Sequence, residues 1–291
     1  MRWTERRHAF RNILAESDCF FPASVHDPLT ARIAEEIGFE AGMFAGSTAA
    51  LAVLGAPDMC TISVSEFAEQ ALRINRASSL PLIVDGDHGY GNALNVMRTV
   101  EELEIAGVCA ITIEDTDLPI KFGVQGASYI STEEAVGKLR AALQARQDPT
   151  LSIVGRTALD SRNTLDELMT RLPAYVATGI DAIFISGVQT IEQLKRISSI
   201  VAIPVMLGAS KLAVYSNREV LAQHGVRIAL QGHHPVKAAV HATYDTLNAL
   251  REGVPPNELQ NLATDETMQR LTQQKKYQKN ANAFLNHSTD T

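Results

Sequence analysis

Acidic side chains stand at the ends of two consecutive apolar segments of this sequence. Asp85 and Asp87 flank a glycine where the first segment ends, and Glu114 ends the second. Carboxylates that converge in a low-dielectric site repel each other, and a hard divalent cation relieves that repulsion. We expect a Mg²⁺ site, with Mn²⁺ possible, in which Asp85 is the direct ligand. Asp87 and Glu114 would act mainly through water, and Asp58 is a possible outer-shell acid. The competing interpretation is that these acids cap helices and form salt bridges.

Three further polar side chains lie at the ends of other apolar segments. Arg156 could clamp a substrate carboxylate, or it could form a structural salt bridge to one of the acids. Ser47 and the backbone N–H groups around it could hold the same anion. His233 could contact substrate or transfer a proton, although either His233 or its neighbour His234 could instead cap the following helix.

Other chemistries lack their sequence signals. Gly86, Gly89 and Gly91 do not complete the GxGxxG pattern of dinucleotide sites, and GxxxxGK[ST] does not occur. These glycines are better explained by tight turns and close approach of the backbone to a ligand. No Ser/His/Asp or Cys/His nucleophile set falls at one strand-end rim, and no histidine cluster has zinc spacing.

The elements that must position these residues alternate between strand and helix. Short apolar runs with no polar alternation are typical of strands covered on both faces. Such runs are Cys19–Ala23, Ala41–Ala45, Leu82–Asp85, Ala110–Glu114, Leu151–Gly155, Ala182–Ser186, Ile203–Leu207 and Arg227–Gln231. Their number favours a TIM-type (β/α)8 barrel, with an open doubly wound sheet as the alternative. In such a barrel the polar strand ends gather at one rim.

Helix boundaries are also visible in the sequence. Asp27 precedes a first-turn proline, and Ser131, Thr164 and Ser216 each stand three residues before a glutamate, the pattern of a capping box. Pro173 predicts either a kink or a later start for the helix that contains it.

Composition limits the class of protein. The chain has 291 residues with 45% hydrophobic and 20% charged residues and a formal net charge of −7. Without a basic block, sequence-independent nucleic-acid binding is disfavoured. No apolar run is long enough to span a membrane, and no apolar signal core follows the N-terminus. Three scattered cysteines without CxxC indicate a reducing cytoplasm.

The chain divides into two predicted parts. Residues 1–252 form the barrel, which is the catalytic domain, and residues 253–291 form an additional C-terminal helical segment. This tail is rich in Gln, Asn, Thr and Lys with scattered apolar residues. We expect it to pack on a neighbouring subunit and to fray after about residue 287.

From about residue 8 to about residue 250 the sequence resembles the isocitrate lyase/phosphoenolpyruvate mutase superfamily, and within it the oxaloacetate decarboxylase branch. The stretches that carry the resemblance are Ser24–Pro28, Gly46–Ser47, Ala56–Asp58, Asp85–Arg98, Thr112–Thr116, Gly155–Thr157 and Gly232–His233.

The resemblance implies Mg²⁺- or Mn²⁺-dependent enzymes that act on small 2-oxo and 2-hydroxy diacids or on phosphonate analogues. It implies that Asp85 anchors the metal and that Ser47 and Arg156 hold substrate oxygens. His233 matches the position that the decarboxylases use for substrate contact, which favours it over His234. It further implies a homotetramer, a dimer of dimers, in which the helix after the barrel is swapped onto a partner.

Departures from the family pattern narrow the chemistry. Lyases of the superfamily carry Lys-Lys-Cys-Gly-His in the loop after the fourth strand, whereas here Phe122 replaces the cysteine and Val124 the histidine. The polar loop of the phosphonate mutases is also not found in residues 117–128. Ala158 stands where the family usually has Asn or Asp, and the exit of strand seven, residues 207–211, lacks the aromatic residue expected in the decarboxylase branch.

Together these features predict Mg²⁺-dependent decarboxylation of oxaloacetate, or of a 3-substituted relative, to pyruvate and CO₂ through a metal-stabilised enolate. Arg156 and Ser47 would orient the C1 end of this small 2-oxo dicarboxylate, and water or His233 would supply the proton. Tyr90 and His88 could shape the pocket or be packed behind it. The alternatives are another C–C or P–C bond enzyme of the superfamily (a diacid lyase or hydrolase, or a phosphonopyruvate-type enzyme) and a catalytically silent barrel.

Overall fold

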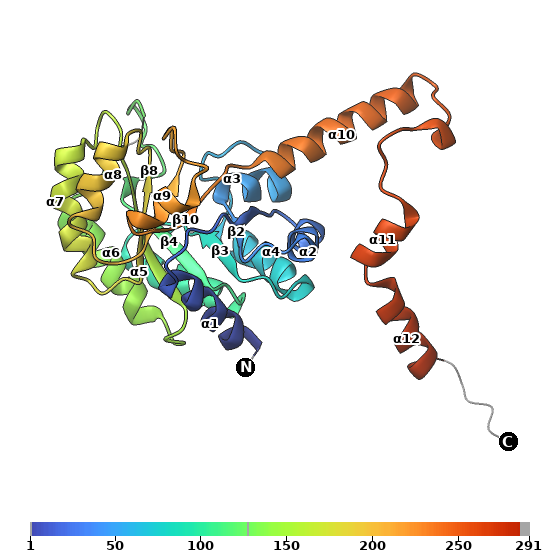
Figure 1. Cartoon of the computed structure of the whole chain (residues 1–291), viewed down its shortest axis with the longest axis horizontal. Coiled ribbons are helices and arrows are strands. Elements are labelled where there is room, and N and C mark those ends of the chain that lie inside the picture. The colour runs from blue at the N-terminus through green and yellow to red at the C-terminus, as the bar shows by residue number, and fades with distance from the viewer. Residues whose placement is uncertain (1, 127, 286–291) are drawn as a thin grey trace. The chain divides into compact units, whose positions relative to one another are not determined.

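The computed structural model describes residues 2–126 and 128–285. By its internal contacts the chain forms two compact units, residues 1–234 and 235–291. The first unit contains a parallel eight-stranded sheet with helices around it (Figure 1). The strands, in sheet order, are β1 (Ala23–Ser24), β2 (Gly42–Phe44), β3 (Leu82–Asp85), β4 (Ala110–Glu114), β7 (Ser152–Ala158), β8 (Ala182–Ser186), β9 (Val205–Gly208) and β10 (Val226–Ala229).

Pairing between the two ends of the sheet closes it. Phe20 forms a parallel bridge with Ile228, in which the Phe20 N–H donates to the Arg227 carbonyl at 2.8 Å and the Ala229 N–H donates to the Phe20 carbonyl at 3.0 Å. This closure confirms the TIM-type barrel over the open sheet. The first predicted strand is displaced, because only an isolated bridge forms at Phe20 and β1 begins at Ala23.

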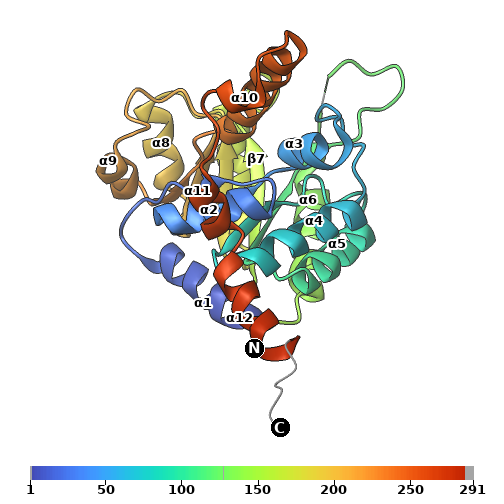
Figure 2. The same ribbon diagram turned by 90° about the vertical axis from the view of Figure 1, so that its right-hand side faces the viewer.

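Helices cover the outside of the barrel. Figure 2 shows α4, α5 and α6 side by side on one flank. The helices of the first unit are α1 (Arg2–Ala15), α2 (Pro28–Ile37), α3 (Gly46–Ala49), the π-helical turn η1 (Ala50–Leu54), α4 (Val64–Ala77), α5 (Ala93–Ile105), α6 (Thr132–Ala145), α7 (Leu165–Val176), α8 (Ile191–Ser198) and α9 (Arg218–Gln223).

Most of the predicted helix starts are confirmed. Asp27, Ser131 and Thr164 are N-caps whose side chains accept a backbone N–H of the first turn. The prediction at Ser216 is wrong by one residue, because the side chain of Asn217 accepts the Val220 N–H instead. Asparagine is as good an N-cap as serine, so the capping pattern alone could not separate the two. α7 begins at Leu165 and continues through Pro173, so no later start occurs.

The barrel interior is filled from the strands and closed at one end by α1. Phe10, Ile13 and Leu14 of α1 pack with interior side chains such as Met43 and Met206 in one buried cluster. The helix α1 is absent from the elements predicted from the sequence. Four of its fourteen residues are arginines, and its apolar residues are concentrated in its second half, so it lacks a simple amphipathic period.

The second unit is helical, as the fold prediction had it. It contains α10 (His234–Arg251), except for His234, which belongs to the first unit. It also contains a short 3₁₀ turn η2 (Pro256–Glu258), α11 (Asp265–Leu271) and α12 (Gln274–Phe284). The unit therefore begins near the start of α10, whereas the predicted domain boundary follows residue 252. The fraying predicted after about residue 287 lies outside the described residues. None of the described helices is long and apolar enough to cross a membrane.

Candidate active site

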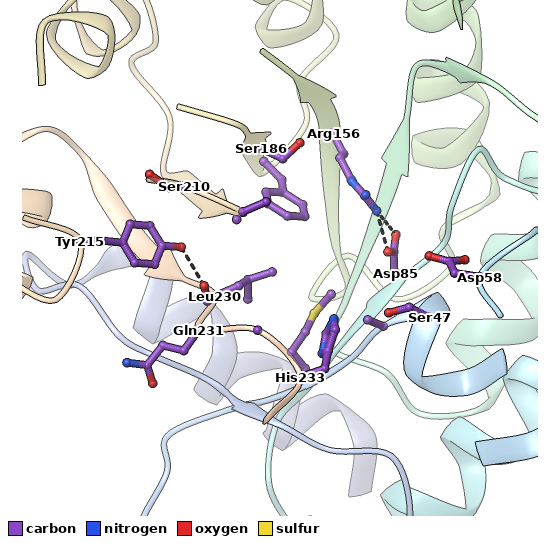
Figure 3. A pocket seen from close by; sticks show the side chains of 16 residues that line it. Ser47, Asp58, Asp85, Arg156, Ser186, Ser210, Tyr215, Leu230, Gln231 and His233 are labelled. Atoms are coloured by element: carbon purple, nitrogen blue, oxygen red, sulfur yellow. Dashed lines mark hydrogen bonds and ion pairs between the residues drawn. The ribbon is translucent and has the colours of Figure 1, made fainter. Parts of the chain in front are cut away.

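A cavity of about 590 Å³ opens at the carboxyl ends of the barrel strands. Among the residues that line it are Ser47, Asp58, Asp85, Arg156 and His233, all of which the sequence singled out. Figure 3 shows the acids and Arg156 on one side of this cavity, with Tyr215 and Gln231 on the other. The barrel thus brings together side chains from the ends of β3 and β7 and from the segments that follow β2 and β10.

Asp85 is the last residue of β3, and the residue is only 8% exposed. Its Oδ1 accepts hydrogen bonds from the Thr112 hydroxyl at 3.0 Å and from the Asp87 N–H at 3.2 Å. Arg156 Nη1 lies 2.6 Å from both carboxylate oxygens. These contacts fix the Asp85 carboxylate at the rim, where the residue lines the cavity.

Arg156 connects two acids. Its Nη1 pairs with Asp85, and its Nε lies 3.1 Å from Glu114 Oε2. Its guanidinium carbon lies 5.2 Å from the centre of the Phe184 ring, a cation–π contact. Burial alone would lower the pKa of Arg156, but the charges of Asp85 and Glu114 raise it. The salt bridge to rim acids that the sequence left open is therefore present, and Arg156 lines the cavity as well.

Asp87 and Glu114 lie behind the cavity wall and do not line it. Burial, followed by the negative charge of Asp85, raises the pKa of Asp87 to about 8, and burial raises that of Glu114. The Glu114 N–H donates to the Asp87 carbonyl at 2.9 Å, which holds the two chain segments together. A Cβ at Gly46 would lie 2.8 Å from Asp87 Oδ1, so the close approach of this carboxylate requires a glycine there.

This set of donors fits a cation bound by few direct ligands. No group of three His, Cys, Asp or Glu side chains in the described part of the chain is arranged to hold one ion directly. Four acids nevertheless lie within electrostatic reach of one arginine, and burial is the largest cause of the raised pKa values of Asp58, Asp87 and Glu114. Mg²⁺ commonly takes one or two carboxylates and completes its shell with water and substrate. The residues fit that arrangement and not a cage of carboxylates.

Asp115, the neighbour of Glu114, points away from the site. Its Oδ2 accepts hydrogen bonds from the Tyr175 hydroxyl at 2.8 Å and from the Thr157 hydroxyl at 2.9 Å, and Arg171 lies 3.4 Å away. The residue is 2% exposed. Asp115 therefore ties β4 to β7 and α7 and is not available to a ligand in the cavity.

His233 lies just beyond β10 and lines the cavity, whereas His234 begins α10 and does not. Nδ1 of His233 lies 2.9 Å from the hydroxyl oxygen of Ser24 at the end of β1. Of the two histidines, His233 is thus the one that lines the cavity.

Among the residues at the site that the sequence did not single out for a role are Ser24, Phe184 and Tyr215. Tyr215 lines the cavity from the segment after β9, and its hydroxyl lies 2.8 Å from the Leu230 carbonyl oxygen. Tyr215 thus brings an aromatic side chain to the cavity, although residues 207–211 contain none. The sequence signal that could have found it is an aromatic residue in a segment that leaves the polar rim.

His88 and Tyr90 do not line the cavity. Burial, together with the charge of Lys138, lowers the pKa of His88 to about 4, so this ring is neutral at pH 7. Lys138 donates to the His88 carbonyl at 3.0 Å. Both aromatic rings are thus packed behind the rim, the second of the two roles that the sequence left open.

The segment after β4 carries no cysteine or histidine. It forms a small hairpin of β5 (Thr116–Asp117) and β6 (Ser128–Tyr129). Between these strands Ile120, Phe122 and Val124 are exposed, and none of them lines the cavity. The proton carrier expected of a superfamily lyase is absent from this segment's sequence.

Comparison with known proteins shows which family the chain belongs to. A model of the family described as phosphoenolpyruvate phosphomutase matches residues 10–251. A protein of Rhodopseudomonas palustris (strain BisA53) named oxaloacetate decarboxylase is 50% identical over 272 residues, 94% of each chain. One of the same name from Bradyrhizobium diazoefficiens is 49% identical over 271 residues, 93% of this chain and 94% of its own.

Among solved structures, that of a phosphonopyruvate hydrolase in complex with oxalate and Mg²⁺ has a TM-score of 0.85 and 28% identity, and the match covers 97% of this chain and 99% of that one. The superfamily that the sequence motifs indicated is confirmed. The chain belongs to the phosphoenolpyruvate phosphomutase family of the phosphoenolpyruvate mutase/isocitrate lyase superfamily.

Proposed function

We propose that this protein is a Mg²⁺-dependent carboxy-lyase that converts oxaloacetate, or a 3-substituted relative, to pyruvate or its homologue and CO₂. The observation that carries the proposal is the 50% identity, over 94% of both chains, to a relative named oxaloacetate decarboxylase. The cavity supports it, because an arginine, a serine and a histidine face a cluster of acids that suits a cation. At about 590 Å³ the cavity also has room for a substituent at C3.

Asp85 would hold Mg²⁺, or Mn²⁺, directly, with Asp87 and Glu114 acting through water and Asp58 further out. When bound, the cation would supply electrostatic stabilisation for negative charge that develops on the substrate. A relative solved with oxalate and Mg²⁺ supports this assignment, because oxalate is a small planar dianion like the C1–C2 end of a 2-oxo diacid.

Arg156 would bind the C1 carboxylate of the substrate. Its Nη1 and Nε pair with Asp85 and Glu114, so Nη2 is the nitrogen assigned to the substrate. The two acids hold the guanidinium plane in one orientation, which lowers the entropy cost of binding an anion there. Ser47, at the start of α3, would donate to the same end of the substrate.

The chemistry of a β-keto acid suits a site without a strong base. Breaking the C3–C4 bond releases CO₂ and leaves the electron pair in the C2–C3 enolate, so no proton has to be removed first. A proton must then be delivered to C3, and His233 is the side chain assigned to deliver it. The loop after β4 presents Phe122 where a superfamily lyase has its cysteine, which is consistent with decarboxylation.

Product analysis tests this function. Purified enzyme with Mg²⁺ is expected to convert oxaloacetate to equal amounts of pyruvate and CO₂ above the background catalysed by the metal alone. Release of oxalate and acetate from oxaloacetate, of glyoxylate or succinate from 2-hydroxy diacids, or of phosphate from phosphonopyruvate, without pyruvate from oxaloacetate, would assign a sibling activity instead. Turnover of none of these would favour a silent barrel.

Replacement of Asp85 tests the metal site. Asp85→Ala should abolish measurable Mg²⁺ binding in titration calorimetry and lower kcat on the order of a hundredfold or more, since it removes the direct ligand. Asp166→Ala, at an exposed acid of α7 that pairs with Arg196, is the control and should bind Mg²⁺ like the wild type. If metal affinity and turnover both survive in Asp85→Ala, the metal assignment is wrong.

We also propose a cytoplasmic homotetramer, a dimer of dimers, in which the C-terminal unit contacts a neighbouring subunit. Three free cysteines, two of them buried, suit a reducing compartment. Val240, Tyr244 and Leu247 are exposed on α10 at positions that share one helix face. A row of large apolar side chains on an exposed helix is typical of a surface that binds another protein.

A further inference from the structure

We propose that Ser24 is a positioning residue that holds the His233 ring through Nδ1 and so makes Nε2 the atom that delivers the proton to substrate carbon. This inference rests on the function proposed above. Ser24 does not line the cavity, whereas His233 does, so Ser24 acts on the substrate only through the imidazole. The contact that carries the proposal is the distance of 2.9 Å between Ser24 Oγ and His233 Nδ1.

The closure of the barrel creates this contact between residues 209 positions apart in the sequence. β1 and β10 end on the same rim, because Phe20, just before β1, pairs in parallel with Ile228 of β10. On its other side the chain at Val25 is tied to β2, through a hydrogen bond of 3.0 Å from its N–H to the Met43 carbonyl. The Ser24 hydroxyl is therefore carried on backbone that pairs with β2 and that follows the Phe20 bridge to β10 by four residues, which makes it a firm support for a side chain that follows β10.

The direction of the hydrogen bond between Ser24 and His233 follows from the proposed role of the imidazole in proton transfer. A proton carrier alternates between imidazolium and neutral imidazole, and Nδ1 stays protonated in both states only if Nε2 is the atom that exchanges. The Ser24 hydroxyl can accept the Nδ1–H bond in both states, so this bond survives the whole cycle. If the hydroxyl instead donated to Nδ1, the bond would be lost whenever the ring became charged.

The proton balance of the step is simple. After CO₂ leaves, the enolate carries an electron pair that forms a new C–H bond at C3 with the proton on Nε2 of the imidazolium. The C2 oxygen returns to a carbonyl, and the product is pyruvate with a neutral imidazole that keeps its proton on Nδ1. Solvent water then returns one proton to Nε2, so the net reaction consumes one proton and releases one CO₂.

Loss of the Ser24 hydroxyl should therefore affect the proton step more than substrate binding. Ser24→Ala removes the hydroxyl that lies 2.9 Å from Nδ1, so we expect kcat to fall about tenfold to a hundredfold while KM changes less than about threefold. Ser24→Thr keeps a hydroxyl on a β-branched residue that a strand tolerates, and it should restore most of kcat. Ser199→Ala, which removes an exposed hydroxyl at the end of α8, is the matched control.

The decisive experiment combines these kinetics with nitrogen NMR of enzyme labelled at histidine, with the His233 signals assigned by comparison with His233→Asn. Above its pKa, His233 should be the Nδ1–H tautomer in the wild type and in Ser24→Thr, and should shift toward Nε2–H in Ser24→Ala. An unchanged tautomer or kcat in folded Ser24→Ala, or a wild-type ring protonated on Nε2 alone when neutral, would overturn the proposal. If the wild type does not decarboxylate oxaloacetate at all, the proposed function fails and the catalytic part of this inference fails with it. The NMR result would then still report whether Ser24 sets the tautomer.

Discussion

Asp87 is a buried acid beside a second acid, and its pKa of about 8 has a consequence for stability. In the unfolded chain an aspartate has a pKa of about 3.9. The folded protein therefore holds this proton more tightly, and the contribution of Asp87 to stability falls as pH rises from about 4 to about 8. A divalent cation can compensate the charge that appears when the proton leaves, so Mg²⁺ and the proton compete.

We therefore predict that saturating Mg²⁺ raises the melting temperature more at pH 8.5 than at pH 6, each compared with a sample in EDTA. Asp87→Asn should reduce this difference between the two pH values, since its side chain cannot ionise. The measurement is thermal unfolding of both proteins in the same four buffers. An equal Mg²⁺ effect at both pH values in the wild type would contradict the assignment of Asp87 to the metal site.

At this scale the sequence predicted the residues whose chemistry is evident from type and position. Asp85 and Arg156 could be found because a charged residue at the end of an apolar run has to lie at the rim of a barrel. Ser24 and Phe184 could not, because their roles depend on the direction of a side chain and on partners distant in sequence. The ion pair between Arg156 and Asp85 was left open for the same reason.

At the scale of elements, α1 shows how much the barrel depends on a helix outside its repeat. Phe10 is completely buried among the interior side chains of the strands, with Ile13 and Leu14 beside it. Arg7 anchors the helix by hydrogen bonds from Nε to the Val108 carbonyl at 2.9 Å and from Nη1 to Asp148 at 2.8 Å. α1 is therefore part of the hydrophobic core.

Phe10→Ala should lower the free energy of unfolding by about 3–5 kcal/mol, because it leaves a cavity at the closed end of the barrel. Chemical denaturation measured by circular dichroism gives this value. His8→Ala, at an exposed position of the same helix, is the control and should change stability by less than about 0.5 kcal/mol. If the two substitutions cost the same, α1 does not close the core.

The strands and α1 differ in how far the sequence could predict them. Leu82–Asp85, Ala110–Glu114 and Ala182–Ser186 are strands with the predicted bounds, because residues buried on both faces leave continuous apolar runs. A helix that buries one end and pairs its arginines with carbonyls and acids leaves no such pattern. Such a helix can be inferred only from the fold, because the apolar side chains at the closed end of the barrel have to be covered.

At the scale of the whole molecule, α10 tests the proposed tetramer. Tyr244→Glu places a charge on the exposed apolar face that Val240, Tyr244 and Leu247 form, and desolvating that charge at an interface is costly. We predict a smaller oligomer for this variant in size-exclusion chromatography with light scattering. Ala242→Glu, on the opposite face of α10, adds the same charge and should keep the wild-type mass. A wild type that is monomeric, or a Tyr244→Glu variant of unchanged mass, would contradict the role given to α10.

The most direct test of the central claim is the rate of pyruvate formation from oxaloacetate with Mg²⁺, corrected for the metal-catalysed background, in wild type and Arg156 variants. We predict turnover well above background in the wild type, and a kcat/KM lower on the order of a hundredfold or more in Arg156→Ala. Arg156→Lys should recover only part of the lost kcat/KM, since an ammonium group cannot pair in one plane with the carboxylates of Asp85, Glu114 and the substrate. Arg140→Ala, at an exposed arginine of α6, should be as active as the wild type. Turnover no faster than Mg²⁺ alone, or full activity in folded Arg156→Ala, would contradict the account.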